Sequence, residues 1–157
     1  MYAYCKRPYK ITLLDAEVVS FDESLMGMEY FKVENYKGFN YLSAKYSVKS
    51  EEVNRVNLKA IVNSKTNGKL TKFFEISKPL CDFIKTDVFF YKDIPTFGNL
   101  PRSCPIELGE YRINNYTVNL NRFPANLPFT KLYANVDFLL DNKSISKIKL
   151  EIAIEKA

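Results

Sequence analysis

The chain has 157 residues, the size of a single domain, and its 46% hydrophobic and 15% aromatic content excludes an intrinsically disordered protein. The net charge is +5, but the basic residues are spread among 18 acidic ones, which is typical of a solvated surface and does not indicate a nucleic-acid partner. The sequence has no histidine, so it lacks the commonest general base and the commonest metal ligand. We therefore expect no metal site and no cofactor.

Apolar and polar side chains alternate in several segments, which predicts half-buried β-strands. These segments are 42–49, 56–63, 132–140 and 147–155, and residues 70–76 are expected to return as the hairpin partner of 56–63. Asn67 and Gly68 suit the tight turn of a hairpin because both tolerate a positive φ, and residues 141–144 turn the chain before the last strand.

Residues 10–21 predict a strand with a bulge, because the parity of the apolar positions changes within the segment. Between residues 77 and 92 the spacing becomes helical, with Ser77 as the expected N-cap and Pro79 near the first turn. Residues 94–105 contain three prolines and one glycine and predict an ordered loop. Seven or eight short strands with one short helix predict an all-β fold, a two-sheet β-sandwich, with a barrel as the alternative.

Three cysteines leave several arrangements open. A disulfide between Cys81 and Cys104 would close a loop of about 23 residues. It would stabilise the folded state by about 3 kcal/mol, because it lowers the conformational entropy of the denatured chain. The alternative is three reduced cysteines in a cytosolic protein. Cys5 is left over: it is free, paired between chains, or the mark of a partner cysteine that this chain lacks. The first ten residues contain no apolar signal core, which indicates either a cytosolic protein or a mature chain whose leader was replaced by a start methionine.

Two N-x-S/T sequons occur, at Asn115 and at Asn142. The second lies in the predicted tip of the last hairpin, where a side chain is exposed. Both positions are compatible with glycosylation, but such triplets also arise by chance, so neither alone indicates secretion.

Several short motifs follow one another in the second half of the chain. They are K-P-x-C-D-F at 78–83, N-L-P at 99–101, C-P at 104–105, G-x-Y-x-I-x-N-Y at 109–116 and P-x-x-L-P at 124–128. On these motifs the stretch 78–140 resembles the C-terminal half of a large insect family of secreted proteins. These are the CheB-type chemosensory proteins and their largely uncharacterised relatives, placed near the ML lipid-recognition superfamily.

The resemblance implies an immunoglobulin-like, ML-like β-sandwich that spans residues 1–157 as one domain. It implies a disulfide between Cys81 and Cys104 and a secreted, extracellular mature chain without its signal peptide. It also implies a hydrophobic pocket between the sheets and supplies no catalytic residues, because the family motifs are structural. We therefore expect a non-catalytic binding protein for a lipid or another hydrophobic small molecule, with a chemosensory role.

Large apolar side chains on the predicted strands and helix are the candidates for the wall of this pocket. They are Tyr46, Leu58, Phe74, Phe83 and Phe138. The alternative is that these side chains form a dry core.

Two other classes of protein compete with the ligand binder, and the oligomeric state stays open in each. An enzyme could use paired carboxylates, but no spacing singles out a pair among Asp82, Asp87, Asp93 and Asp137. An extracellular interaction module, an accessory subunit of a membrane receptor or channel, would need an exposed aromatic patch, expected at residues 89–91.

Overall fold

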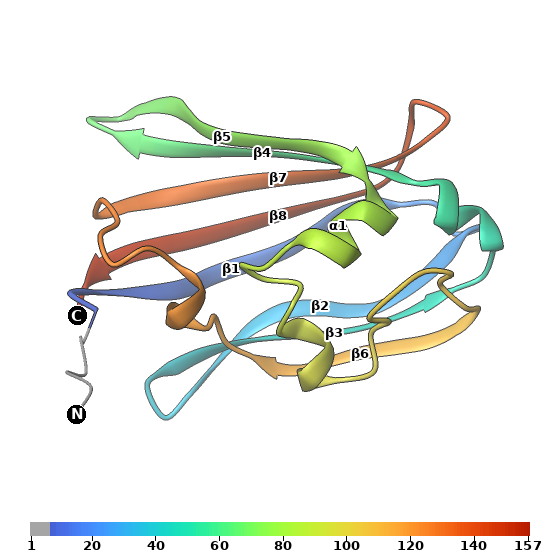
Figure 1. The fold of residues 1–157 in the computed structure, drawn as a ribbon, viewed down its shortest axis with the longest axis horizontal. Helices are drawn as coiled ribbons and strands as arrows, with labels where there is room; N and C mark the ends of the chain where they lie inside the picture. Colours follow the sequence, from blue (N-terminus) through green and yellow to red (C-terminus); the bar gives the residue numbers. More distant parts are fainter. Residues whose placement is uncertain (1–6) are drawn as a thin grey trace.

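The computed structural model describes residues 7–157, so Cys5 lies outside the described residues. Eight strands form two antiparallel sheets that pack face to face, with one α-helix and three short 3₁₀-helices (Figure 1). The elements are β1 (Tyr9–Phe21), β2 (Met26–Tyr36), β3 (Phe39–Val48), η1 (Glu51–Arg55), β4 (Asn57–Thr66), β5 (Lys69–Pro79), α1 (Leu80–Thr86), η2 (Ile94–Phe97), β6 (Gly109–Tyr116), η3 (Leu120–Arg122), β7 (Thr130–Leu140) and β8 (Lys143–Lys156). The predicted all-β, two-sheet β-sandwich with one short helix is confirmed.

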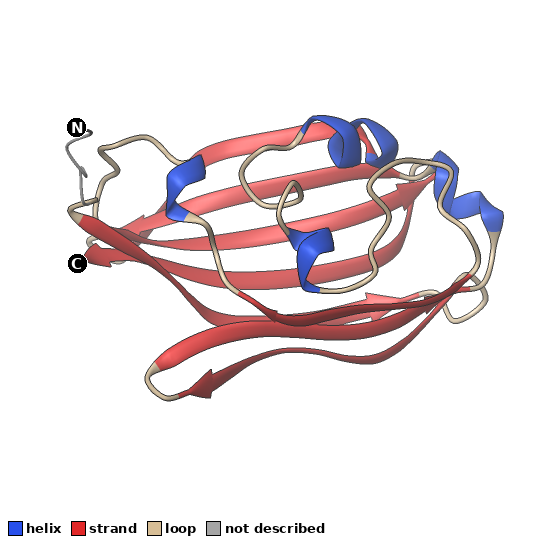
Figure 2. Ribbon diagram, turned by 60° about the horizontal axis from the view of Figure 1, so that its bottom comes forward, coloured by secondary structure: helices blue, strands red, loops and turns tan. Residues whose placement is uncertain are grey.

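The larger sheet has five strands in the order β1-β8-β7-β4-β5, and the smaller sheet has three in the order β2-β3-β6. The chain passes from β1 directly into β2 of the other sheet, which closes one side of the sandwich. On the other side, α1 and the short helical turns lie between the sheet edges (Figure 2). The long connections therefore cover the side on which β5 and β6 are the outermost strands.

Tight turns with positive φ connect the hairpins. In the β4–β5 turn, φ is 53° at Asn67 and 77° at Gly68, and in the β7–β8 turn it is 50° at Asp141 and 64° at Asn142. Asn, Asp and Gly tolerate this region best, which is why they mark turns in a sequence. Both predicted hairpins are confirmed.

β-Bulges explain which strands the alternation of apolar and polar side chains predicts and which it does not. In β1 the pairing with β8 shifts after Leu13 and again after Val18, which confirms the predicted bulge. Alternation alone does not identify β2, because its pairing with β3 shifts between Met28 and Tyr30 and the inward parity changes there.

The predicted helix over 77–92 is longer than the observed one, α1 (Leu80–Thr86). Ser77 is not its N-cap, because β5 continues to Pro79 and pairs with β4 over its whole length. After α1 the Asp87 carboxylate accepts hydrogen bonds from the backbone N–H groups of Phe90 and Tyr91, both at 2.8 Å. These bonds stabilise a turn in place of further helix.

Buried side chains form three hydrophobic clusters among the described residues. The first packs β1, β4, β7 and β8 against β3 and β6. The second surrounds α1 and the connection before β6, and the third lies where the β1–β2 turn meets the end of η1 and the start of β8. The interior is therefore divided along its length.

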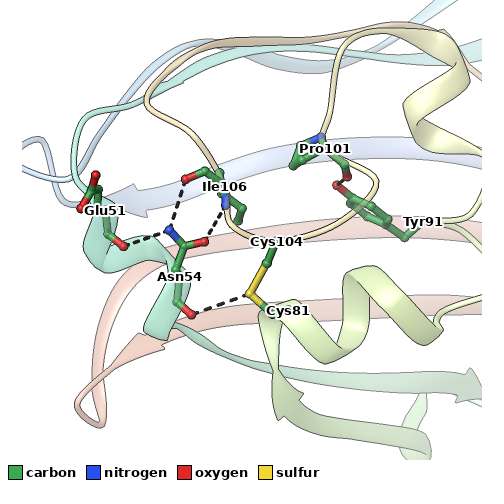
Figure 3. Close-up of a disulfide and its surroundings, with 7 residues drawn as sticks. All are labelled: Glu51, Asn54, Cys81, Tyr91, Pro101, Cys104 and Ile106. Atoms are coloured by element: carbon green, nitrogen blue, oxygen red, sulfur yellow. Dashed lines mark hydrogen bonds between the residues drawn. A yellow bond between two sulfur atoms is a disulfide. The ribbon is translucent and has the colours of Figure 1, made fainter.

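A disulfide joins Cys81 of α1 to Cys104, with the Cα atoms 5.8 Å apart, as expected (Figure 3). Asn54 of η1 fastens the same connection: its amide donates to the Ile106 carbonyl at 3.2 Å, and its Oδ1 accepts from the Ile106 N–H at 2.6 Å. The Cys81 sulfur lies 3.7 Å from the Asn54 carbonyl, a contact only, because a disulfide sulfur has no proton to donate. Tyr91 adds a hydrogen bond from its hydroxyl to the Pro101 carbonyl at 2.5 Å.

Replacing both bonded cysteines, Cys81→Ser with Cys104→Ser, should lower the free energy of unfolding by about 3 kcal/mol, since the closed loop no longer restricts the denatured chain. Chemical denaturation measures this difference. Dithiothreitol should lower the midpoint of the wild type and leave the double variant unchanged. Equal midpoints for the oxidised wild type and the variant would contradict the prediction.

Candidate ligand-binding site

One cross-strand row of apolar side chains runs across all five strands of the larger sheet. In the order β5, β4, β7, β8 and β1 its members are Ile76, Ala60, Val136, Ile148 and Val18. Residues directly opposite each other in antiparallel strands point to the same face, so the five side chains share one face.

The neighbouring row shows that this face is the inner one. Val62, Ala134, Leu150 and Ala16 lie two residues further along the same strands, so they have the same orientation. Val62, Ala134 and Ala16 are buried in the first cluster together with residues of the smaller sheet. The row at Val136 therefore also faces the smaller sheet.

The row is nevertheless incompletely covered. Ile76, Val136, Ile148 and Val18 are only half-buried, and within residues 7–157 they lie outside the three core clusters. An inward apolar surface that stays accessible is unusual in a close-packed sandwich, where facing side chains interdigitate. We name these four residues the inner row.

Tyr46 of β3 is a polar side chain on the inner face of the smaller sheet, where it packs against the second cluster. It lies opposite Met28 of β2, which is half-buried, and its ring stacks on Tyr111 of β6 with centroids 5.6 Å apart. Burial, followed by the neighbouring Tyr91 and Tyr111, raises the pKa of the Tyr46 hydroxyl, which stays neutral. Tyr111 donates to the Glu107 carbonyl, whereas no hydrogen bond joins the Tyr46 hydroxyl to another described residue.

The five predicted wall residues separate into two groups and one outlier. Leu58 and Phe138 lie directly opposite each other, two residues along β4 and β7 from the pair Ala60 and Val136. Tyr46 and Phe83 both pack against the second cluster. Phe74 belongs to the outermost strand β5 and is 38% exposed, with its ring edge-on to Phe73.

The prediction of wall residues did not include the inner row. Val136 and Ile148 lie on the apolar parity of strands that alternation identifies, so the signal was present, but aromatic side chains were favoured as wall material. These residues form a row only because β7 and β8 pair in register with β4 and β1. These strands are far apart in the chain, so alternation within one segment does not show the row.

A bidentate ion pair joins two of the connections that cover the open side of the sandwich. We name these connections, residues 80–108 and 117–129, the covering segments. Arg122 of η3 donates from Nη2 to Asp93 Oδ1 at 3.0 Å and from Nε to Asp93 Oδ2 at 3.1 Å. Both side chains are partly buried, Arg122 being 32% and Asp93 15% exposed, and the Arg122 guanidinium holds the pKa of Asp93 below its usual range. The pair connects the segment after α1 to the segment before β7.

Most of the candidate acids of an enzyme are committed to structural bonds. Asp87 caps the turn after α1, and Asp93 pairs with Arg122. Asp137 accepts a hydrogen bond from the Ser144 hydroxyl at 2.5 Å and lies 3.9 Å from the Lys147 ammonium, while Asp82 is exposed on α1. Within residues 7–157 no group of three metal-binding side chains is close enough to hold an ion.

The aromatic patch expected at residues 89–91 is wrong in two of its three members. Phe89 is 42% exposed, but Phe90 packs edge-on against Phe123 with centroids 5.6 Å apart and is half-buried. Tyr91 is buried in the second cluster, where its hydroxyl donates a hydrogen bond to the Pro101 carbonyl.

Two surface hollows lie near the covering segments, and neither is lined by the inner row. One of about 220 Å³ lies beside α1, lined by Ile84, Lys85, Asp87, Val88, Tyr91, Lys92, Pro95 and Arg102. The other, of about 460 Å³, lies between η1 and the connection before β6, lined by Glu51, Asn54, Pro105, Ile106, Glu107 and Leu108. No helix of the described residues is long and apolar enough to cross a membrane.

Comparison with known proteins adds a family match over part of the chain. Residues 56–133 match the model of a family described as "Protein of unknown function (DUF1091)". The matched segment includes both bonded cysteines and four strands, β4 to β7 in part or whole. It does not include β1, β2, β3 or β8, and of the four inner-row residues it contains only Ile76.

No curated protein matches the chain. Among solved structures the chain is similar to a Niemann-Pick type C2 protein from the Japanese carpenter ant, with 17% sequence identity over 90% of this chain and 89% of that chain, and a TM-score of 0.30. At this score the two structures do not superpose closely enough to transfer a ligand or the role of a residue.

Replacing Asp93 by Asn should cost about 1 kcal/mol of stability at neutral pH, because the charge-assisted bonds to Arg122 are lost. The pKa of Asp93 is depressed in the folded protein, so the contribution is present above the pKa of the unfolded chain, about 3.9, and is lost as the pH falls through the folded value. Urea denaturation of wild type and Asp93→Asn should thus differ at neutral pH and converge in acid. Asp15→Asn, at an exposed position of β1, should match the wild type, and a difference that persists undiminished in acid would contradict the prediction.

Proposed function

We propose that this protein is a non-catalytic binder of a lipid or another hydrophobic small molecule, held between the two sheets against the inner row. The observation that carries this proposal is the row itself: Ile76, Val136, Ile148 and Val18 face inward, are apolar, and remain half-buried. An apolar ligand would complete the packing that the protein's own side chains leave open.

The energetics favour an acyl chain or another extended apolar ligand. Each CH₂ group removed from water contributes about 0.8 kcal/mol, while transfer from a membrane is nearly neutral, so such a protein takes up and releases lipid without strong polar recognition. Binding sites of this kind orient the ligand with few polar groups. The unpaired hydroxyl of Tyr46, on the facing sheet, is a suitable one.

We further propose that the chain is a secreted, single ML-like domain with a chemosensory role. The Cys81–Cys104 disulfide supports an oxidising compartment, since such bonds are rare in the cytosol. The motifs between residues 78 and 128 support a relationship to CheB-type proteins.

The second candidate is an extracellular interaction module, an accessory subunit of a membrane receptor or channel. It is favoured by Val88 and Phe89, neighbours after α1 that are 46% and 42% exposed. Apolar side chains exposed side by side suit a protein partner.

Substitutions at two inward-facing valines distinguish a ligand-binding interior from a dry core. Val136→Phe should be tolerated with a loss of less than about 1 kcal/mol, because Val136 is half-buried, and it should weaken binding of the fluorescent fatty acid cis-parinaric acid at least tenfold by occupying the site. Val62→Phe, at a buried position of the same face, should cost about 1–3 kcal/mol through overpacking.

Native mass spectrometry of the wild type from a secretory host should show a co-purifying lipid. If Val136→Phe and Val62→Phe destabilise the protein equally and the wild type carries no lipid and binds no cis-parinaric acid, the interior is a dry core. The interaction module then replaces the ligand binder.

Asn142 should carry a glycan when the protein is made in a secretory host, because it lies in the exposed β7–β8 turn. Asn115 is also exposed but belongs to β6, where its backbone N–H donates to Ser43 Oγ at 3.1 Å. Amidase treatment should shift the gel mobility of the wild type, and Asn142→Gln should remove most of that shift, with Asn115→Gln removing the remainder. Unchanged mobility after treatment would count against both sites.

A further inference from the structure

The four most exposed large apolar side chains of the described residues are Tyr36, Phe39, Leu70 and Phe129, with exposed fractions from 57% to 66%. They flank the β2–β3 turn, follow the β4–β5 turn and precede β7. Exposing such side chains to water is unfavourable, and isolated cases are ordinary, but the placement of all four in loops at one end of the molecule is not.

These loops lie at one end of the sandwich. Figure 1 shows the β2–β3 turn, the β4–β5 turn and the start of β7 at the same end, on the left of the view. The register agrees for the larger sheet: Lys65 of β4 lies opposite Leu70 of β5 on one side and opposite Lys131 of β7 on the other. We name residues 36–39, 65–72 and 129–131 the basic end.

The charged residues of these three segments are of one sign, although Glu155 of β8 lies at the same end, where it pairs with Lys10. The basic end contains Lys37, Lys65, Lys69, Lys72 and Lys131 and no aspartate or glutamate. Lys72 pairs with Glu75 and Lys131 lies 3.9 Å from Glu151, but Lys37, Lys65 and Lys69 form no ion pair with a described residue. Because Lys65 and Lys131 lie directly opposite each other, an external anion beside Lys65 would reduce their mutual repulsion.

The opposite end of the molecule carries more acidic than basic residues, with Lys49, Arg55 and Lys143 as its basic ones. The β1–β2 turn, η1 and the β7–β8 turn lie there (Figure 1) and contribute Asp22, Glu23, Glu51, Glu52 and Asp141. Arg55 pairs with both Glu52 and Asp141. This separation of charge along the long axis orients the protein in an electric field.

We propose that the basic end docks onto an anionic lipid bilayer, with Tyr36, Phe39, Leu70 and Phe129 inserted at the headgroup level and the lysines against the lipid phosphates and carboxylates. Rings and aliphatic side chains beside lysines are the composition that favours the membrane interface. Each lysine near an anionic surface strengthens binding about fivefold. In this orientation the opposite end, with the β1–β2 and β7–β8 turns, points away from the membrane. Docking does not depend on the proposed ligand site between the sheets.

The absence of tryptophan from the sequence allows a direct test. Phe39→Trp places a single tryptophan at the basic end, and Leu108→Trp places one at an exposed position beside η1. With phosphatidylcholine vesicles that contain phosphatidylserine, the emission of Phe39→Trp should shift to the blue, and that of Leu108→Trp should not. No shift for Phe39→Trp, or equal shifts for both, overturns the proposal.

Charge variants test the electrostatic part. Lys65→Gln with Lys69→Gln should weaken vesicle binding about 25-fold in a flotation assay, while Lys49→Gln with Lys143→Gln, at the opposite end, should change it little. Pure phosphatidylcholine vesicles should bind weakly, and salt should weaken binding to the anionic ones. Equal binding to both vesicle types, or binding to a soluble acidic protein without binding to vesicles, contradicts a membrane surface as the partner.

Discussion

The antiparallel register of the larger sheet determines which side chains face the smaller one, and the rest of the structure depends on it. Two bulges in β1 let its apolar residues stay inward although their parity changes along the chain. The register aligns β5, β4, β7, β8 and β1 so that their apolar positions form continuous rows. One row is buried in the first cluster, and the next, at Val136 and Ile148, remains half-buried, which makes it the candidate ligand surface.

The covering segments on the side between β5 and β6 are held by a few specific bonds rather than by a sheet. The Cys81–Cys104 disulfide joins α1 to the connection before β6, and Asn54 fastens that connection to η1. The Asp93–Arg122 pair joins the remaining two segments. These bonds anchor connections whose apolar side chains, among them Tyr91 and Ile106, pack into the core clusters. The inner row lies outside those clusters and is left to be covered by the facing sheet or by a ligand.

Two chemical features of the molecule are spatially separate. The inner row lies between the sheets, whereas the most exposed apolar side chains and the unpaired lysines lie in loops at one end. A protein that holds an apolar molecule inside and meets a lipid surface at one end would exchange that molecule with the surface, because transfer between the two apolar environments is nearly neutral in free energy. Neither feature needs a catalytic group, and Asp87, Asp93 and Asp137 serve the structure.

The sequence by itself determined the class of the fold, the strands with regular alternation and the hairpins at Asn67-Gly68 and 141–144. These depend on short-range chemistry: side-chain period, φ preference and turn composition. Tertiary structure alone decided the end of α1, the division of the core and the accessibility of the inner row. Alternation shows which residues share a face of one strand, but it does not show which strand lies alongside or how closely the opposing sheet packs. Those follow from pairing between distant segments, such as β1 with β8.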